Sequence, residues 1–336
     1  MAITPTTRQF QNADKLVAAS IKNLEAQAVL AATVQKQAAG QFDGTVGQAV
    51  AIRRPSMLVA NQGRVDALKG DTSKITVTSL AETVLNIELD QHIYSAVALS
   101  DAELSLEIPD FAAQVAFPQA DAVVDKLERL IVGQMETFKG FKDAKTGVPA
   151  AKSELDLSTG DEISKAQKIR FALAQAAAQL TGFNVPTSGR FAVLGAEAAG
   201  ILMNDPNLTR VNEAGTGSAL REAVIGKLYG FTLVQSNHID PLAVYCYHPS
   251  AVQLVNRAPI VPPSVKVGSS QARDGYAIRW VRDYDASIAA ERSFFSTFAG
   301  AKAVDDKVRD AKTGDVKAGG VVRGLKFSLK TANAGG

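Results

Sequence analysis

The residues whose chemistry could support catalysis are few and scattered along the chain. The 336 residues include one cysteine, Cys246, and three histidines, His92, His238 and His248. A thiol beside an imidazole could form a nucleophile and its base, but Cys246 and His248 lie two residues apart near a predicted strand, and that spacing does not aim them at each other. Because Cys246 alternates with tyrosines in an apolar strand, we predict a buried, unreactive thiol.

The remaining motifs also favour structural interpretations. GTGS at 215–218 resembles a phosphate loop, but it lacks the preceding strand and the Lys-Ser/Thr pair, so a glycine turn is expected. His238 with Asp240 predicts an ion pair within a loop, and His92 falls on the polar face of a long strand. The sequence therefore predicts no enzyme, with no catalytic, cofactor-binding or metal-binding residues.

An acidic group follows the long strand. Its carboxylates are those of Asp101, Glu103, Glu107 and Asp110. Such a group could bind a cation or act as an acid–base pair, but no histidine, nucleophile or nucleotide loop lies beside it. We predict an acidic contact surface that is solvated or faces a basic neighbour.

Composition excludes several classes of protein. Lys+Arg 36 against Asp+Glu 34 gives a formal net charge of +2, too small for phosphate binding to organise the chain. Hydrophobic residues make up 46%, yet no run approaches the roughly 18 apolar residues of a membrane helix. One cysteine cannot close an internal disulfide, and the N-terminus lacks an apolar signal core. A soluble protein made in a reducing compartment is predicted.

The first 40 residues show a loose helical pattern with a narrow apolar stripe. A long helix with so thin a stripe usually needs a surface supplied by something else, so we predict an arm that docks outside its own domain. The alternative is an ordinary surface helix on its own core.

A long hairpin is predicted next. Residues 49–59 and 75–78 form its strands, and from Leu85 to Leu99 apolar residues recur at odd positions. A ribbon this long must bend between two sheets or project from the body. The hairpin carries charged residues and little that could form a core. The charged residues are Arg53, Arg54, Arg64, Asp66, Lys69, Asp71 and Lys74. We interpret them as an intersubunit contact, and a charged edge that prevents pairing is the alternative.

The rest of the chain predicts a body with an insertion. A helix of about 20 residues opens at Pro118, and its charged residues, Asp125 and Arg129 among them, are expected to be solvated. The aperiodic stretch 139–160 marks a boundary. Beyond it, a helix capped by Asp161, further strands and helices, and a short helix from Pro249 to Val255 make an α+β unit. Strands resume at 275–298, and residues 321–330 could add another.

This order of elements, together with five segments, resembles the major capsid proteins of tailed bacteriophages, whose fold is named after phage HK-ninety-seven. The segments are LDQHIYSAVALSDAELSLEIPDF (89–111), PQADAVVDKLERLIV (118–132), GRFAVLGAEAAGILMNDPNL (189–208), ALREAVIGKLYGFTLVQSNHI (219–239) and GYAIRWVRDYD (275–285). These segments resemble residue patterns that recur across the family, and they contain no catalytic motif.

The resemblance implies an α+β fold with five parts. These are an N-terminal arm (1–45), an extended β-hairpin loop (46–80), a peripheral domain (81–159 and 256–300) with a spine helix at about 118–138, an inserted axial domain (160–255) and a C-terminal extension (301–336). Some relatives join subunits by a Lys–Asn bond; Lys69 and Lys74 lie on the matching loop, but no Asn and Glu align with them.

The resemblance also implies a function. Copies would assemble into hexamers and pentamers of an icosahedral shell around phage double-stranded DNA, which the shell would contact non-specifically. A separate scaffolding protein is expected because only about 40 residues precede the hairpin, and portal and decoration proteins would be further partners, with no membrane and no cofactor. The expected location is the virion, after synthesis and assembly in the cytoplasm of a bacterial host. An encapsulin-type nanocompartment shell is the alternative, and a two-domain soluble enzyme is a less favoured one.

Overall fold

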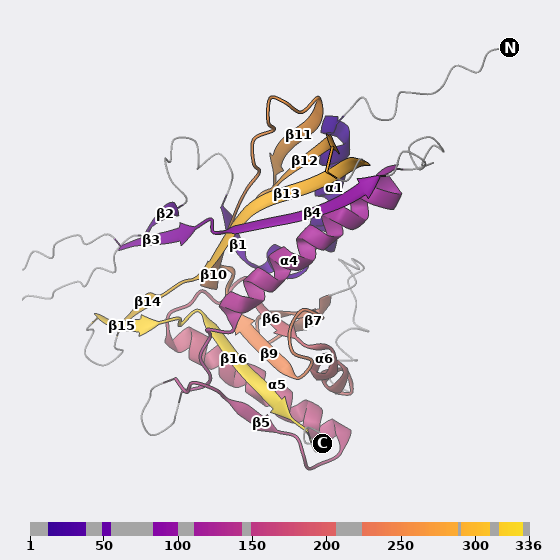
Figure 1. Cartoon of the computed structure of the whole chain (residues 1–336). Helices are drawn as coiled ribbons and strands as arrows, with labels where there is room; N and C mark the ends of the chain where they lie inside the picture. Colours follow the sequence, from indigo (N-terminus) through magenta and orange to yellow (C-terminus); the bar gives the residue numbers. More distant parts are fainter. Residues whose placement is uncertain are drawn as a thin grey trace, which may run out of the picture.

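A computed structural model describes residues 13–37, 49–54, 83–99, 111–142, 149–205, 224–287, 290–309 and 316–331. These residues form two six-stranded sheets, two two-stranded ribbons and several helices. The sheets lie one above the other in Figure 1, and the long helix α4 (Phe117–Met135) runs between them. The mixed α+β class predicted from the sequence is confirmed.

The upper sheet has the strand order β1-β10-β13-β12-β11, and β4 pairs with β13. Its strands are β1 (Gln35–Gln37), β4 (Gln91–Leu99), β10 (Val252–Arg257), β11 (Val267–Arg273), β12 (Tyr276–Asp285) and β13 (Ala290–Ala303). All pairings are antiparallel except that of β1 with β10. Tyr276, Ile278 and Trp280 are buried together, as their alternation in the sequence predicted.

The lower sheet has the order β5-β16-β9-β6-β8-β7. Its strands are β5 (Glu154–Asp156), β6 (Arg190–Leu194), β7 (Val224–Leu228), β8 (Phe231–Gln235), β9 (Ala243–Tyr247) and β16 (Gly324–Lys330). Helices α5 (Glu162–Gly182) and α6 (Ala196–Met203) pack on it through a core that includes Leu173, Leu202 and Phe231. The predicted cap is present, since the Asp161 carboxylate accepts a hydrogen bond from the backbone N–H of Ser164.

Helix α4 joins the two sheets into one core. Pro118 lies in its first turn, as predicted, and a π-helical segment (Ala112–Ala116) precedes it directly. Its buried stripe packs in a cluster that contains Trp280 and Phe295 of the upper sheet together with Tyr245 and Tyr247 of the lower one. The two sheets are therefore covered in part by the same helix.

The prediction that the N-terminal segment docks outside its own domain is wrong for residues 13–37. Helix α1 (Ala13–Gln27) buries Val17, Ile21 and Leu24 completely against α4, β11 and β12, and α2 (Leu30–Thr33) continues on α4. The narrow stripe suffices because the chain itself supplies a matching apolar face. Residues 1–12 and 38–48 lie outside the described residues.

The predicted long strand bends between two sheets, as expected from its length. Strand β3 (Thr83–Glu88) pairs with β2 (Ala49–Arg54) in a separate ribbon, and β4 begins after residues 89–90 in the upper sheet. Figure 1 shows the β2–β3 ribbon projecting to the left of the body. The ribbon crosses Gly300 of β13 so closely that a Cβ there would collide with the Glu88 carbonyl oxygen. The expected strand segments 55–59 and 75–78 fall outside the described residues.

Two predictions near the end of the chain also need correction. The short helix expected from Pro249 to Val255 is a single 3-10 turn (Pro249–Ala251) followed by strand β10, because the valine-rich segment pairs with β13. The last strand, expected within residues 321–330, is present as β16, and it lies inside the lower sheet between β5 and β9. A second ribbon, β14 (Asp306–Arg309) with β15 (Val316–Gly320), precedes it.

Candidate functional site

The residues predicted for intersubunit contact are only partly described. Arg53 and Arg54 end β2, where their backbones pair with Val84 and Thr83 of β3. The other five hairpin residues lie outside the described residues: Arg64, Asp66, Lys69, Asp71 and Lys74. The predicted acidic surface, Asp101, Glu103, Glu107 and Asp110, lies outside them as well. Both assignments stay predictions.

An exposed aromatic face on the upper sheet is the feature that the sequence analysis missed. On β4, His92 and Tyr94 point away from α4, and they meet Phe294 and Phe298 of the adjacent strand β13. The Tyr94 ring stacks on Phe294 with 5.7 Å between centroids, and yet Tyr94 is 61% exposed and Phe298 37%. Such contiguous apolar surface is typical of contact sites.

Two arginines border this aromatic face. The guanidinium carbons of Arg279 and Arg292 each lie 5.6 Å from the centroid of the Phe294 ring. Arg292 also forms ion pairs with Asp283 at 2.7 Å and Asp285 at 3.1 Å. The face is thus an aromatic strip with fixed cations at its edge, a composition found at the centres of protein interfaces.

The cysteine and two of the histidines have structural surroundings. Cys246 is fully buried, and burial raises the pKa of its thiol far above the ordinary value, so it is the unreactive group that the sequence predicted. His92 is exposed, as predicted, although it also packs in the aromatic face. His248 caps the Pro249 turn, where its ring nitrogen Nδ1 accepts from the Ser250 N–H.

His238 has different partners from the one predicted. Its ring lies beside two carboxylates of α4, with Nδ1 3.4 Å from Asp125 Oδ1 and Nε2 3.5 Å from Glu128 Oε2. Asp240, the predicted partner, accepts a hydrogen bond from the Leu242 N–H instead. The prediction was wrong because the fold brings α4 closer to the ring than its neighbour in sequence.

Glu128 is a completely buried carboxylate that sequence reasoning did not identify. Its Oε1 accepts hydrogen bonds from the backbone N–H groups of Leu30 at 2.8 Å and Ala31 at 3.2 Å. Burial is the main cause that raises the pKa of Glu128 to about 7. The helical repeat could have predicted this burial, because position 128 falls four residues after the buried Val124 and beside the buried Leu127.

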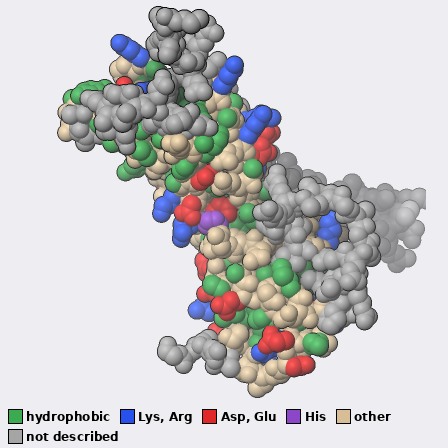
Figure 2. All heavy atoms as spheres, turned by 90° about the vertical axis from the view of Figure 1, so that its right-hand side faces the viewer, with side chains coloured by type: hydrophobic (Ala, Val, Ile, Leu, Met, Phe, Trp, Pro, Cys, Tyr) green, Lys and Arg blue, Asp and Glu red, His purple; other side chains and the backbone are tan. Residues whose placement is uncertain are grey.

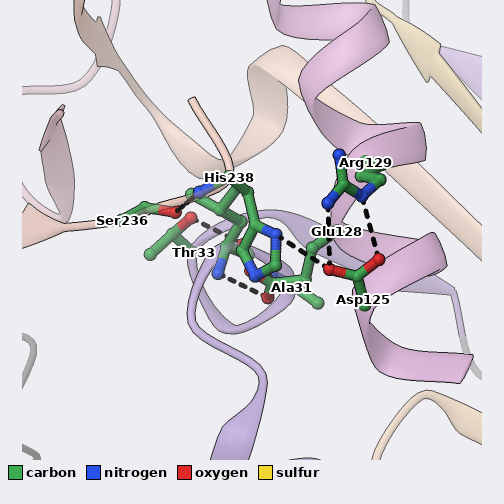
Figure 3. Close-up of polar contacts among 8 residues, drawn as sticks. Ala31, Thr33, Asp125, Glu128, Arg129, Ser236 and His238 are labelled. Atoms are coloured by element: carbon green, nitrogen blue, oxygen red, sulfur yellow. Dashed lines mark hydrogen bonds and ion pairs between the residues drawn. The ribbon is translucent and has the colours of Figure 1, made fainter. Parts of the chain in front are cut away.

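Figure 3 shows how three parts of the chain meet at this point. Helix α4 supplies Asp125, Glu128 and Arg129, the N-terminal segment supplies Ala31 and Thr33, and the connection after β8 supplies His238. Arg129 pairs with Asp125 at 2.9 Å, and its cation lowers the pKa of that carboxyl. We call these residues the α4 junction.

Neither metal binding nor membrane crossing has support in the described part of the chain. No group of three or more His, Cys, Asp or Glu side chains there is placed to hold a metal ion. No helix there is long and apolar enough to span a bilayer.

Comparison with known proteins identifies the fold through structure alone. No protein-family model matches the chain, and no curated protein matches it. A solved structure from Mycobacterium phage Che8 is 21% identical, with 90% of this chain and 91% of that chain covered and a TM-score of 0.55. The asymmetric unit of the mature capsid of bacteriophage PhiM1 is 14% identical, with coverage of 85% and 83% and a TM-score of 0.53.

A third match comes from a source that is not a phage. The virus-like particle from Pyrococcus furiosus is 10% identical, with 95% of this chain and 100% of that chain covered and a TM-score of 0.51. Because each of these matches spans at least 83% of both chains, the similarity covers the whole architecture and not one motif. The chain therefore has the HK-ninety-seven-like fold that the sequence resemblance implied.

Proposed function

We propose that this chain, which has the fold of tailed-phage capsid subunits, is a major capsid protein that assembles into an icosahedral shell around double-stranded DNA. The observation that carries the proposal is the match to phage structures, a mature capsid among them, along almost the entire chain, with 91% of the Che8 chain and 83% of the PhiM1 chain covered. Proteins of this architecture present several surfaces to sister copies, so the function is assembly into hexamers and pentamers and needs no reaction.

Two surfaces of the described residues support assembly. The β2–β3 ribbon leaves the body, and among the described strands β2 and β3 pair with each other alone, an arrangement that suits pairing with another chain. Within the described part of the chain, no element covers the exposed rings of the aromatic face, which consists of His92, Tyr94, Phe294 and Phe298. We infer that the extended hairpin of one subunit lies on the peripheral part of its neighbour, where the aromatic face offers apolar area.

The charge distribution supports a container in preference to a reader of nucleic acid. The net charge is +2, and acidic and basic side chains lie interspersed among the coloured atoms of the face in Figure 2. Specific readers concentrate Lys and Arg on one face. Contact with packaged DNA would be non-specific, and the C-terminal segment 301–336, with eight basic and four acidic residues, is the part best suited to it.

The non-enzymatic part of the proposal rests on the surroundings of the reactive groups. The cysteine is buried, His248 caps a turn and His238 joins elements together, so each has a structural role. A separate scaffolding protein and a portal are the further partners that we propose, with decoration proteins as optional additions, and the virion is the proposed location.

A nanocompartment shell is the second candidate, because one fold match is described as a virus-like particle and its source is not a phage. The Pyrococcus furiosus virus-like particle is covered completely by this chain. Its TM-score of 0.51 is below the 0.55 of the Che8 match, and so we place the phage shell first. The two candidates differ in cargo, which is nucleic acid in one case and protein in the other.

Electron microscopy of the purified protein tests the proposal. Expression of the chain, alone and with the neighbouring genes of its source genome, should give closed icosahedral particles built of hexamers and pentamers. Particles that contain DNA support the phage shell, whereas particles filled with a protein cargo support the nanocompartment. A compact monomer under every condition would contradict both.

Deletion of residues 60–74 tests the hairpin contact separately. The variant should remain folded by circular dichroism, because the core residues identified above lie elsewhere, and it should fail to close shells. Normal particles from this deletion would remove the hairpin from the intersubunit contact and leave the shell assignment intact.

A further inference from the structure

The α4 junction contains a buried carboxylate oxygen that has no hydrogen-bond partner. Glu128 Oε1 is fully used by the N–H groups of residues 30 and 31, whereas Oε2 is buried without a hydrogen bond. The imidazole of His238 lies next to this oxygen, with Nε2 3.5 Å from Oε2. A buried unpaired oxygen is costly, so what fills this gap matters for stability.

The polar groups that face the junction come from three elements, and the charged ones among them come from α4. From α4 itself, Asp125 faces the other nitrogen of His238 at 3.4 Å, and Arg129 holds Asp125 in its ionised form. The lower sheet contributes the hydroxyl of Tyr247, which bonds Thr33, and burial raises its pKa far above neutrality. The N-terminal segment contributes only backbone donors to Glu128.

The number of protons shared by His238, Asp125 and Glu128 decides whether both nitrogens of the ring can form hydrogen bonds. His238 lies between two acceptors, and each gap is attractive only when it holds a proton; otherwise lone pairs face each other. One proton on Nδ1 serves Asp125, and a second proton, on Nε2 or on Glu128 Oε2, serves the other gap. The fully bonded junction therefore holds two protons, and removal of one leaves a gap of opposed lone pairs.

We propose that the second proton, shared between Glu128 and His238, is a latch that fastens the β8–β9 connection, residues 236–242, to α4. When it is lost, His238 can bond only one of the two carboxylates, and the connection loosens from the helix. Because α4 packs on both sheets, the latch controls how firmly the lower sheet is held to the upper one at this point.

The pKa shifts of the two groups are consistent with loss of the shared proton near neutral pH. Burial raises the pKa of Glu128 to about 7, and burial is also the main cause that lowers the pKa of His238 below its ordinary value, against the opposing effect of Asp125. Two interacting groups of this kind titrate as a pair. His238 keeps 19% of its side chain exposed, which gives the proton a route to solvent. The latch belongs to the subunit and does not depend on the proposed shell.

Hydrogen exchange of the full-length protein, followed by mass spectrometry at pH 5.5 and pH 8.5, tests the latch. Labelling times are adjusted for the intrinsic pH dependence of exchange, and peptides from β12 and β13 serve as the internal reference. We expect protection of residues 236–242 to fall about tenfold at the higher pH, a size typical of a local opening that costs one strong hydrogen bond. Unchanged protection in the wild type would overturn the proposal.

Three variants separate the latch from general pH effects. Glu128→Gln supplies a permanent N–H toward Nε2, so protection should be equal at both pH values. His238→Gln should be equally loose at both, and because His238 is partly exposed this variant can be read even if the Glu128 variant does not fold. His92→Gln changes an exposed histidine whose ring packs on the aromatic face and not at the junction, so it should keep the wild-type response. A pH-dependent opening that persists in both junction variants contradicts the latch.

Discussion

The hydroxyl groups of Thr33 and Tyr247 lie 2.5 Å apart, although the two residues are separated by 214 positions in the chain. Thr33 Oγ1 donates to the carbonyl oxygen of Leu30, so the Tyr247 hydroxyl is the donor to Thr33. Tyr247 belongs to the lower sheet and Thr33 to the N-terminal segment. This buried bond fastens the N-terminal segment to the lower sheet and adds to the apolar packing of α1 and α2 on the chain's own core.

Tyr247→Phe tests the contribution of that bond. The substitution removes only the hydroxyl, so we expect the free energy of unfolding to fall by about 1 kcal/mol, with the Thr33–Leu30 bond retained. Urea unfolding of the purified protein measures the change. Tyr284→Phe is the matched control, because that ring is 61% exposed and its hydroxyl is in reach of solvent; its effect should be close to zero. Equal effects of both variants would contradict the role of the bond.

Glu128 gives a pH dependence whose sign follows from the direction of its pKa shift. The folded value is about 7 and the ordinary value is 4.5, so between these pH values the folded protein keeps a proton that the unfolded chain has released. Stability from this group is therefore complete below about pH 4.5 and declines as pH rises to about 7, by at most roughly 3 kcal/mol.

Thermal unfolding of wild type and Glu128→Gln measures this dependence. The variant lacks the titration, so its stability relative to the wild type should increase from pH 5 to pH 8. A substitution at Glu136 offers a control. Glu136 is an exposed residue at the end of α4, and its hydrogen bond with Lys326 helps to lower its pKa. Between pH 5 and pH 8 the Glu136 carboxyl is ionised in both states, so Glu136→Gln should keep a constant difference from the wild type. A parallel pH profile for wild type and Glu128→Gln would rule out the raised pKa.

The sequence predicted the elements well wherever the signals were local. Asp161 at the start of α5, Pro118 in the first turn of α4 and the alternation around Trp280 each depend on neighbours in the chain, and each prediction is confirmed. The docking of α1 and the partner of His238 were predicted wrongly. Both depend on which surface the fold brings close, and a helical period does not contain that information.

The candidate sites were harder to predict than the fold for a physical reason. Glu128 was missed because an acidic residue in an amphipathic helix is normally solvated, and here backbone donors of the N-terminal segment make its burial tolerable. The aromatic face was missed because Tyr94 and Phe294 belong to strands almost 200 residues apart and become neighbours only through the pairing of β4 with β13.

Tyr94 tests the aromatic face as an assembly surface. Tyr94→Ser removes an exposed ring, so the fold should persist, whereas any contact that buries the ring should lose about 1–2 kcal/mol per subunit pair. Because every subunit repeats the loss, shell yield by electron microscopy and sedimentation should drop severely. Tyr94→Phe keeps the ring and should assemble normally. Assembly of the serine variant at the wild-type level would exclude this face from the contact.

Gly300 and Gly133 provide a pair of identical substitutions with opposite expected effects. At Gly300 a Cβ would collide with the carbonyl oxygen of Glu88, which cannot move without displacing the end of β3. Gly300→Ala should therefore lower stability by about 1–3 kcal/mol and change the direction in which the β2–β3 ribbon leaves the body.

Gly133 lies in the last turns of α4 and is exposed, and apart from its own helical turn no described atom lies within 4 Å of a Cβ placed there. Gly133→Ala should raise stability by about 0.5–1 kcal/mol, because alanine loses less backbone entropy in a helix. Thermal and urea unfolding compare the two variants directly, and particle formation adds a second measurement. Since the ribbon leads toward a neighbouring subunit in the proposed shell, Gly300→Ala should impair assembly more than its loss of stability accounts for, while Gly133→Ala should assemble like the wild type. If both variants assemble normally, the crossing at Gly300 sets stability alone and does not aim the ribbon.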